Sequence, residues 1–527
     1  MTKPERIVAS EGGRKKSLIL ITMGLVSSLI MLDSNIVAVA LPSIARSLGA
    51  SFAEIEWVVS AYILAFAALL LAAGSYADKH GRKLAMLIGI GIFTLASALC
   101  GLATSALMLN LSRALQGVGA SLLLTASLAV INHTFVGTER AKAYAFWGAC
   151  LGVAITCGPI IGGVITTLFG WRWAFLLNLP ICTVLFIVAC KVVEESADHE
   201  AKRLDYAGIF SFSVGLFFLI WALIDGNNAG WTSEVIVVRL TIACAVLVAF
   251  YFIEARQVRP MVDFALFRQR TFLGSAFAMV GYAGGAQVLI FFLPLLLQNA
   301  YDFTPAMAGL AMLPFALPMF LTPRLGASLG SRYSGRTLLT VGLVVTTVGN
   351  LALSVFASTH VTYPVFACGM LVAGIGAGLL NSETAKVMQG AVPAQRAGMA
   401  SGISATTRFV GLLLGVAVTG AVLSMGVVRR FLSSGAIQGL APDLVARAAK
   451  RVASGDLHGV IETLDRSIQL RIHSAASTAF AGGFGDASLV AAIVASVSAV
   501  LTFMLVQAVD TAPVARGAAV EAMPVME

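Results

Sequence analysis

Two ionisable residues lie inside apolar stretches of this sequence, where a charge is costly. Asp33 falls in the apolar run that starts near Leu18, and Arg113 falls in the run at about residues 106–130. An ionisable side chain deep in a membrane-spanning helix predicts a functional site. Each residue stands about seven positions from the same end of its predicted helix, which at about 1.5 Å per residue places both roughly 10 Å deep. If the two helices are neighbours, the carboxylate and the guanidinium can interact.

A pairing of Asp33 with Arg113 would suit proton coupling. A nearby guanidinium favours the ionised carboxylate, whereas burial favours the neutral acid. A carboxylate between these two influences can change its protonation when its surroundings change. We therefore expect Asp33 and Arg113 to couple proton movement to substrate movement. The alternative is a permanent ion pair that only fixes the packing of two helices.

Two further charges lie within predicted helices. Arg408 could bind a substrate or a phosphate head group, but we favour a side chain that extends to the inner membrane surface. Glu383 stands near the inner end of its helix, and a simple pair with Lys386 is the favoured interpretation. Asp33 is then the one buried acid that is evident, which favours monovalent or neutral substrates over divalent cations.

Composition indicates the elements that must position these residues. Hydrophobic residues make up 58% of the 527 residues and charged residues only 12%, whereas a soluble domain carries about a quarter charged residues. Apolar stretches of about 20 residues recur, each long enough to cross about 30 Å of hydrocarbon. We expect an all-α polytopic membrane protein with fourteen transmembrane helices. The predicted helices are at about residues 18–40, 54–76, 84–103, 106–130, 140–165, 172–192, 205–225, 234–253, 272–297, 305–329, 336–356, 361–385, 401–424 and 487–508.

The distribution of Lys and Arg predicts how the chain is oriented. Most of the 35 Lys and Arg residues fall in the N-terminal segment and in every second loop, whereas the short loops on the other side hold only Arg46 and Arg172. The positive-inside rule then places both termini in the cytoplasm of a cell whose inner (plasma) membrane the chain crosses many times. The net charge of +9 is explained by these loops, so we expect no nucleic-acid partner.

The predicted spans divide the chain into five parts. The long outer segment 427–485 contains amphipathic helical patterns and could cap the outer mouth or be a solvated hairpin without a role. The parts are a cytoplasmic N-terminus (1–17), an N-terminal six-helix half (18–192), a linker with two extra transmembrane helices (193–271), a C-terminal six-helix half that includes 427–485 (272–508) and a cytoplasmic tail (509–527).

Residues 74–83 carry a short motif between the second and third helices. Glycine at a helix end allows close backbone approach, and a carboxylate at position 78 can cap or face a neighbouring helix N-terminus. The pattern resembles the cytoplasmic signature of the major facilitator superfamily. The residues at the signature's spacing are Gly74, Asp78, Gly81, Arg82 and Lys83.

Three further motifs resemble the 14-helix drug/proton antiporter branch of that superfamily. The segment from Leu32 through Pro42 is similar to its helix 1 signature, with Ser34 and Asn35 as departures. Arg113 through Gly119 is similar to the helix 4 motif, whose arginine is assigned to proton coupling. The fifth helix resembles the antiporter motif, in which proline removes a helix hydrogen bond and glycines allow bending and tight packing. Its residues are Gly158, Pro159, Gly162 and Gly163, with Ala154 where the family usually has glycine.

The resemblance implies a major facilitator fold with two six-helix halves and two extra linking helices. The second half carries a degenerate copy of the cytoplasmic signature at 326–336, as expected if the two halves are related. The implied function is multidrug efflux by proton-coupled antiport and alternating access, with the motif around Asp78 latching the outward-facing state. No cofactor, metal or enzymatic activity is implied.

The resemblance also implies a central cavity lined by the first, fourth, ninth and twelfth helices, with side chains from the second. An aromatic wall with one acid suits lipophilic, often cationic compounds. Besides Asp33, the candidates for the wall are Trp57, Tyr62, Gln116, Tyr282, Gln287, Phe291, Phe292 and Asn381.

Other functions remain open at this point. A dedicated exporter of a metabolite, amino acid or siderophore would carry the same signatures, because fold does not report substrate. A non-transporting membrane receptor is a more remote alternative. The sequence shows neither a filter-like loop of a channel nor a Walker-type phosphate loop. The expected partners are a small-molecule substrate, protons and the lipid bilayer, whereas the need for a periplasmic adaptor is not indicated either way.

Overall fold

The computed structural model describes residues 3–135, 137–197, 205–257, 260, 262–330, 332–392, 397–437, 441–454 and 465–508. Within these residues the regular secondary structure is helical throughout. Fourteen helical stretches are long and apolar enough to cross a membrane, which confirms the predicted number. A helix satisfies all of its backbone hydrogen bonds internally, as a chain in hydrocarbon must.

The first half of the bundle contains seven helical elements that form six spans, because α6 and α7 share one span. Two more helices, α8 (Tyr206–Ala229) and α9 (Glu234–Arg256), follow in the chain. The first seven are α1 (Lys3–Leu48), α2 (Phe52–His80), α3 (Arg82–Gly101), α4 (Ala106–Thr134), α5 (Gly137–Leu168), α6 (Trp173–Leu176) and α7 (Asn178–Val192).

The second half contains two spans that are each built from more than one helical element. One span, residues 270–299, is broken at mid-length by a π-helical turn, and another joins α12 to α13. The elements are η1 (Phe264–Arg268), α10 (Arg270–Tyr282), η2 (Ala283–Gln287), α11 (Leu289–Asn299), α12 (Pro305–Ala311), α13 (Leu313–Leu329), α14 (Gly335–Ser358), α15 (Tyr363–Gly390), α16 (Ala397–Leu432), η4 (Gly435–Ile437), α17 (Pro442–Val452) and α19 (Arg466–Leu505).

Local sequence explains where several helices begin. The hydroxyl of Ser51 accepts the backbone N–H of Glu54, and the Glu54 carboxylate accepts the Ser51 N–H in return, which is a capping box. Ser105 caps α4 and Ser334 caps α14 through the same kind of hydroxyl contact. These caps bind backbone N–H groups that have no partner inside the helix.

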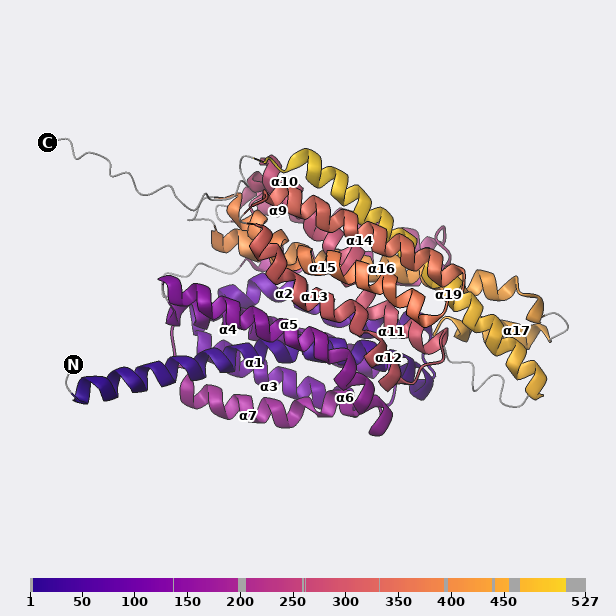
Figure 1. Ribbon diagram of the computed structural model, residues 1–527, viewed down its shortest axis with the longest axis horizontal. Coiled ribbons are helices and arrows are strands. Elements are labelled where there is room, and N and C mark those ends of the chain that lie inside the picture. The colour runs from indigo at the N-terminus through magenta and orange to yellow at the C-terminus, as the bar shows by residue number, and fades with distance from the viewer. Residues whose placement is uncertain are drawn as a thin grey trace.

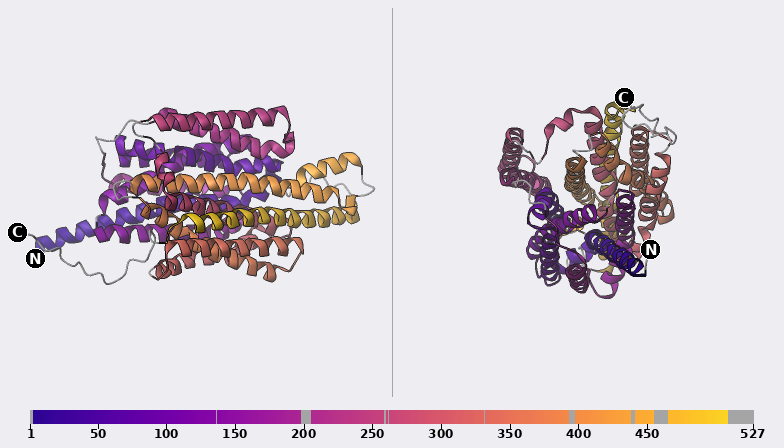
Figure 2. Two further views of the ribbon diagram at one scale, coloured as in Figure 1. Left: turned by 90° about the horizontal axis from the view of Figure 1, so that it is seen from above. Right: turned by 90° about the vertical axis from the view of Figure 1, so that its left-hand side faces the viewer.

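The helices form two groups that pack side by side (Figure 1). Helix α4 packs against α2 and α3, and α1 packs against α5, while α14 packs against α15 and α19. The two groups meet mainly where α5 contacts α12 and where α2 contacts α16. Helices α8 and α9 lie together at one edge of the bundle (Figure 2), and α8 contacts both α2 and α16.

The outward surface of the bundle is apolar. Leu107, Leu168 and Phe210 are each more than half exposed, at 68%, 68% and 71%. Apolar surface of this extent on many helices fits contact with lipid acyl chains rather than water.

The segment 427–485 differs from the prediction. Helix α16 continues to Leu432 and α19 already begins at Arg466, so the expectation that the last helix starts near 487 was wrong. The added turns of α16 and α19 pack closely on one another, since a Cβ on Gly483 would lie 2.5 Å from Val427. Arg430 of α16 also pairs with Asp486 of α19. The predicted amphipathic helix is present as α17, which projects at one end of the bundle (Figure 1), while residues 438–440 and 455–464 lie outside the described residues. We call this the α17 end, and the opposite end, where α1 begins, the α1 end.

Candidate functional site

The two charges singled out in the sequence form a buried ion pair. A guanidinium nitrogen of Arg113 (Nη1) on α4 lies 2.6 Å from Oδ2 of Asp33 on α1, and both side chains are fully enclosed, with exposures of 1% and 0%. Helices 1 and 4 are therefore neighbours at this depth, as the pairing hypothesis required. An enclosed pair of this kind is stable only when its remaining hydrogen-bonding atoms also find partners.

Neutral side chains from two further helices complete the site. Oδ1 of Asp33 accepts the amide groups of Gln116, at 2.9 Å, and of Asn178 on α7, at 2.7 Å. The hydroxyl of Ser97 on α3 accepts from the same two amides. The carboxylate thus receives one ionic and two neutral hydrogen bonds, and four helices of the first half meet at this point.

Arg113 is held from the other side by backbone and aromatic contacts. Its Nε donates to the carbonyl of Val58 at 3.0 Å, and Nη1 also donates to Oε1 of Gln116 at 2.6 Å. The guanidinium carbon lies 4.2 Å from the centre of the Tyr62 ring, which is a cation–π distance. We call Asp33, Arg113, Gln116, Asn178 and Ser97 the central network.

Sequence reasoning found three of these five residues and missed the roles of the other two. Neither Asn178 nor Ser97 was among the candidate site residues. An asparagine inside an otherwise apolar run was the signal that could have found the first. A single serine in a membrane helix commonly bonds its own helix backbone, so the second gave no usable signal.

A small cavity lies between the two halves, close to the central network. Its volume is about 30 Å³, which is room for one or two water molecules. Three of the predicted wall residues line it: Tyr62, Gln287 and Phe291. The full lining is Ile30, Met31, Ser34, Asn35, Tyr62, Ile63, Phe66, Ile155, Gln287, Ile290, Phe291, Phe409 and Leu412.

The other predicted wall residues lie elsewhere in this conformation. Asp33 and Gln116 belong to the central network behind Tyr62. The ring of Trp57 lies 6.0 Å from that of Phe217 on α8. The remaining three, Tyr282, Phe292 and Asn381, do not line this cavity either. Hydropathy alone could not distinguish wall from core, because it does not show which way a helix faces.

The second half has its own polar cluster near the cavity. Arg408 on α16 donates through Nε to Gln287 at 3.0 Å and through Nη2 to the hydroxyl of Tyr282 at 3.3 Å. That hydroxyl donates in turn to Asn381 at 2.9 Å. The favoured expectation that Arg408 extends to the membrane surface was therefore wrong, because neutral acceptors on a neighbouring span hold it.

The signature at 74–83 is built around a tight turn. Gly81 has φ +117, and a Cβ there would lie 2.5 Å from the Glu195 carboxylate. Both the backbone conformation and the lack of space therefore require glycine.

The charged residues of the signature have partners on both sides of the turn. Asp78 pairs with Arg82 at 3.0 Å. Of the two roles expected for Asp78, capping a helix or facing its N-terminus, the cap is made instead by Glu195, which accepts the backbone N–H groups of Lys83 and Leu84 at the start of α3. Lys83 also donates to the carbonyl of Cys190, while a Cβ on Gly74 would meet Thr125 at ordinary contact distance.

The glycines of the antiporter motif lie at close helix crossings. Cβ atoms on Gly158 and Gly162 would approach Asn35 and Ile36 of α1 to 2.5 and 2.7 Å. Across the two halves, a Cβ on Gly163 would lie 2.3 Å from the carbonyl of Pro305.

The crossing between the halves is reciprocal. A Cβ on Gly309 of α12 would lie 2.2 Å from the carbonyl of Pro159 on α5. Contacts this close exclude any larger side chain at either glycine. The α17 end is therefore closed by backbone-to-backbone packing of α5 on α12.

A buried acid on α2 was missed by the sequence analysis. Glu56 on α2 is 5% exposed, and its Oε1 has no hydrogen-bond partner. A Cβ on Gly420 of α16 would lie 2.4 Å from that oxygen, so the carboxyl lies at the contact between the halves. Glu56 stands in the second turn of α2, where a charged side chain is usually expected at the membrane surface. The sequence therefore did not indicate that it is buried. The other predicted pair, Glu383 with Lys386, is present at 3.1 Å.

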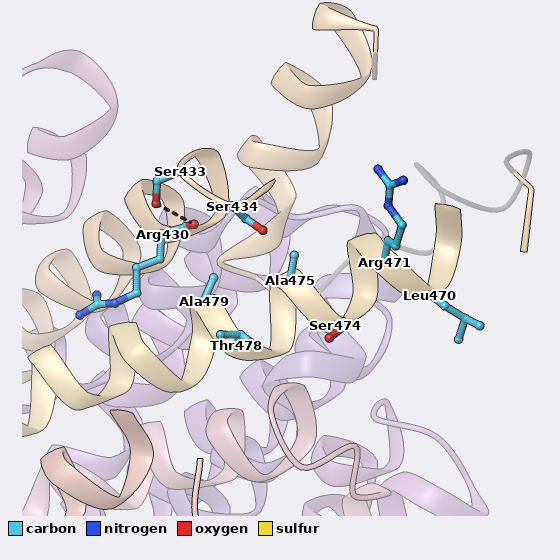
Figure 3. Close-up of a pocket in the computed structure, with 9 residues that line it drawn as sticks. All are labelled: Arg430, Ser433, Ser434, Leu470, Arg471, Ser474, Ala475, Thr478 and Ala479. Atoms are coloured by element: carbon cyan, nitrogen blue, oxygen red, sulfur yellow. Dashed lines mark hydrogen bonds between the residues drawn. The ribbon is translucent and has the colours of Figure 1, made fainter. Parts of the chain in front are cut away.

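A larger hollow at the α17 end is not a candidate substrate site. It has a volume of about 670 Å³ and lies between the extensions of α16 and α19. The guanidinium groups of Arg430 and Arg471 point away from one another (Figure 3), and Arg430 is paired with Asp486. Polar groups that do not converge cannot fix a ligand in one orientation.

Comparison with known proteins identifies the family. The sequence profile of the Major Facilitator Superfamily matches residues 23–416. The chain belongs to the major facilitator superfamily. The multidrug resistance protein Stp of Mycobacterium tuberculosis is 36% identical over 78% of this chain and 76% of its own length. The riboflavin transporter RibZ of Clostridioides difficile is 28% identical over 76% of this chain and 86% of its own length.

The solved structures agree on the major facilitator fold. A bacterial homolog of the human lysosomal transporter Spinster, in an inward-facing and occupied conformation, superposes with a TM-score of 0.63. It covers 94% of this chain and 98% of its own, at 17% identity. In a major facilitator protein with fourteen spans, α8 and α9 are the additional pair between the two six-helix halves.

Proposed function

We propose that this chain is a proton-coupled antiporter that exports lipophilic small molecules across the plasma membrane by alternating access. The observation that carries the proposal is the central network. It holds a carboxylate in full burial beside one cation, within reach of a cavity between two halves that must move. The relationship to a multidrug resistance protein supports efflux as the direction of transport.

The proposed orientation places the α17 end outside and the α1 end in the cytoplasm, following the distribution of basic residues. Two hydrogen bonds join the halves near the α17 end, in addition to the glycine crossing. Gln298 donates to the carbonyl of Val39 at 2.9 Å, and the backbone N–H of Ala306 donates to the Thr167 hydroxyl at 3.0 Å. On this orientation the described conformation is closed toward the outside.

Proton coupling follows from the chemistry of the Asp33 carboxylate. In the closed-outside conformation we assign Asp33 as ionised, since it accepts three hydrogen bonds and a cation lies 2.6 Å away. When the halves separate at the α17 end, water from outside can reach the network and protonate the carboxylate. A neutral acid no longer attracts Arg113 by its charge, so the pair loosens. The proton leaves toward the cytoplasm when the outside closes and the pair forms again.

Tyr62 links the network to the substrate cavity. Its ring lies against the Arg113 guanidinium on one side, and the same residue lines the cavity on the other. If the guanidinium moves when Asp33 is protonated, Tyr62 moves with it, and the shape of the cavity wall against the substrate changes. This gives substrate and proton a shared physical element, as antiport requires.

A dedicated metabolite exporter is the second candidate. The relationship to a riboflavin transporter favours it, and the central network would serve either function. A narrow substrate range would distinguish the metabolite exporter from a multidrug transporter.

The test is efflux from cells that express the chain, with and without a protonophore. The panel contains ethidium as a cation, Nile red as a neutral compound and 2-naphthoate as an acid. We expect protonophore-sensitive efflux that Asp33→Asn abolishes at equal expression. Asp225→Asn is the matched control, because Asp225 also pairs with an arginine, Arg239, at 2.6 Å, but in α8 and α9 away from the cavity. Unchanged efflux in Asp33→Asn would refute the proposed coupling.

A further inference from the structure

The charge of Arg408 is not balanced by any acid that the structure places beside it. Its two hydrogen-bond partners, Gln287 and Tyr282, are neutral. Among the described residues, no ion pair joins Arg408 to a carboxylate. Asp33 pairs with Arg113 and Glu383 pairs with Lys386, while the buried Glu56 lies against Gly420. A guanidinium keeps its charge at any physiological pH. Within the described residues, the cluster around Arg408 therefore carries an uncompensated positive charge inside a membrane span.

Part of that guanidinium is free to bind another molecule. A guanidinium carries five N–H donors, and the described structure uses the one on Nε and one on Nη2. The other terminal nitrogen of Arg408, Nη1, takes part in neither bond. It is also not fully enclosed by the described residues. Arg408 itself is only partly buried. These donors are consequently not fully enclosed by the described residues, and two neighbours of Arg408, Gln287 and Phe409, line the cavity.

Gln287 adds a second donor beside it. Because Oε1 of Gln287 accepts from Arg408, the amide group of Gln287 must present its Nε2 elsewhere. The residue lines the cavity, and Nε2 has no partner and is not enclosed within the described chain. The two side chains are hydrogen-bonded neighbours, and a carboxylate can accept a hydrogen bond both from a guanidinium and from an amide N–H.

The surroundings of the two donors are aromatic and aliphatic. The ring centre of Phe409 lies 5.9 Å from the Arg408 guanidinium carbon, and Phe409 and Phe291 both line the cavity. An aromatic ring that lies on these side chains would bring an attached acidic group to the two donors. A lipophilic cation placed there would meet an uncompensated positive charge and no free carboxylate.

We propose that Arg408 and Gln287 form a subsite for the carboxylate of an aromatic organic acid, so that lipophilic acids are bound in preference to lipophilic cations. This inference rests on the proposed transport function, because it assigns the substrate class of that transporter. It replaces the cationic preference that the sequence suggested, which depended on Asp33 facing the cavity. The cavity of about 30 Å³ must widen to admit such a ligand, as alternating access allows.

The experiment compares three probes that share one ring system and differ in charge. Full-length protein in lipid nanodiscs is equilibrated with radiolabelled 2-naphthoate near neutral pH and competed with unlabelled 2-naphthoate, 2-naphthamide or 2-naphthylmethylammonium. We expect the ammonium compound to compete at least about tenfold more weakly than naphthoate, the size of effect given by a hydrogen-bonded charge pair. In Arg408→Gln, naphthoate affinity falls by at least about tenfold and naphthamide affinity stays within about twofold.

Two further variants keep the result interpretable. Arg408→Lys retains the charge but not the planar fork, so it keeps the preference for naphthoate at reduced affinity and shows the effect even if Arg408→Gln is unstable. Arg239→Gln is the matched control, since it removes a partly buried arginine from α9, and it leaves naphthoate binding unchanged. The proposal is overturned if the wild type prefers the ammonium compound, if it shows no naphthoate binding, or if Arg408→Gln keeps the full preference.

The outcome is separable from that of the proposed function. Equilibrium binding uses no proton gradient, whereas the efflux test depends on one. A chain that prefers naphthoate but whose efflux ignores a protonophore keeps this subsite and loses the proton-coupled function. A chain with protonophore-sensitive efflux of ammonium compounds and no preference for naphthoate keeps the function and loses the subsite.

Discussion

The centres of the two halves are built from similar side chains but differ in their balance of charge. In the first half a guanidinium lies against a carboxylate, and amides complete the shell around both. In the second half a guanidinium lies against an amide and a phenol, with no carboxylate in the described cluster. In the first half the charges balance and the carboxylate is fully hydrogen-bonded. In the second half the described cluster carries a positive charge and has hydrogen-bond donors without partners.

This difference suggests a division of labour between the halves. A neutral, closed network changes its properties only when a proton arrives, so it suits coupling. A charged cluster with free donors changes when a ligand with the opposite charge arrives, so it suits recognition. Both groups contact residues that line the same cavity, Tyr62 in one half and Gln287 in the other. The comparison can be tested by variants that treat the two centres in the same way.

The largest effect is expected from breaking the ion pair of the first half. Arg113→Gln leaves the Asp33 charge fully buried without its cation, which costs about 3–5 kcal/mol. The double variant Asp33→Asn/Arg113→Gln removes both charges and should recover most of that loss. Reversible unfolding in mixed micelles gives the free energies of unfolding. If the double variant is as unstable as the sum of the two single variants, the pair does not act as a unit.

The next largest effect is expected at the crossing between the halves. Gly163→Val places side-chain atoms where the Pro305 carbonyl lies 2.3 Å from a Cβ, and overpacking of this kind costs about 1–3 kcal/mol. The variant should shift the protein toward the conformation that is open at the α17 end. Labelling of Ala306→Cys by a membrane-impermeant maleimide in cells measures that opening, and we expect the labelling rate to rise.

The matched control for this crossing lies on the same helix. A Cβ on Gly148 of α5 would meet nothing within 4 Å, so Gly148→Val should leave the labelling rate unchanged. Equal labelling in the Gly163→Val and Gly148→Val proteins would contradict the assignment of this crossing as the outer closure.

Two asparagines, one in each half, allow a direct comparison. Asn178→Ala removes a hydrogen bond to a charged carboxylate, a loss of about 1.5–3 kcal/mol, whereas Asn381→Ala removes a bond to a neutral phenol, about 0.5–1.5 kcal/mol. The same unfolding measurement checks both. A larger loss for Asn381→Ala than for Asn178→Ala would reverse the contrast between the centres.

The last of these predictions concerns the signature turn. Gly81→Ala forces a Cβ into a backbone conformation with φ +117 and toward the Glu195 carboxylate, which should cost about 1–3 kcal/mol. Gly91→Ala on α3 is the control, because a Cβ there meets nothing within 4 Å. Thermal unfolding of both variants checks the difference, and a Gly81→Ala protein as stable as Gly91→Ala would show that the turn tolerates a side chain.

The sequence was sufficient to predict the fold because hydropathy and basic loops are strong signals in membrane proteins. Fourteen spans could be predicted from apolar length. The equal depth of Asp33 and Arg113 predicted their pairing on the condition that the two helices are neighbours, which the structure confirms. The start of α19 could not, because its first turns pack on α16 through glycines outside the apolar window.

The site was predicted less completely than the fold. The direction of Arg408 could not be predicted, since the same arginine can extend to lipid head groups or turn inward. Glu56 was missed because its burial depends on Gly420, which is distant in the sequence. Residues whose environment comes from the other half of the chain are the ones that local patterns do not reveal.

The most direct test of the account is gradient-driven transport in proteoliposomes made with wild-type protein and with Asp33→Asn. Radiolabelled 2-naphthoate is followed under an imposed pH gradient, and then in exchange between equal concentrations without a gradient. The account predicts that the wild type accumulates substrate against its concentration only with the gradient, and that Asp33→Asn loses accumulation but keeps exchange. Gradient-driven accumulation by Asp33→Asn at the wild-type level would contradict it.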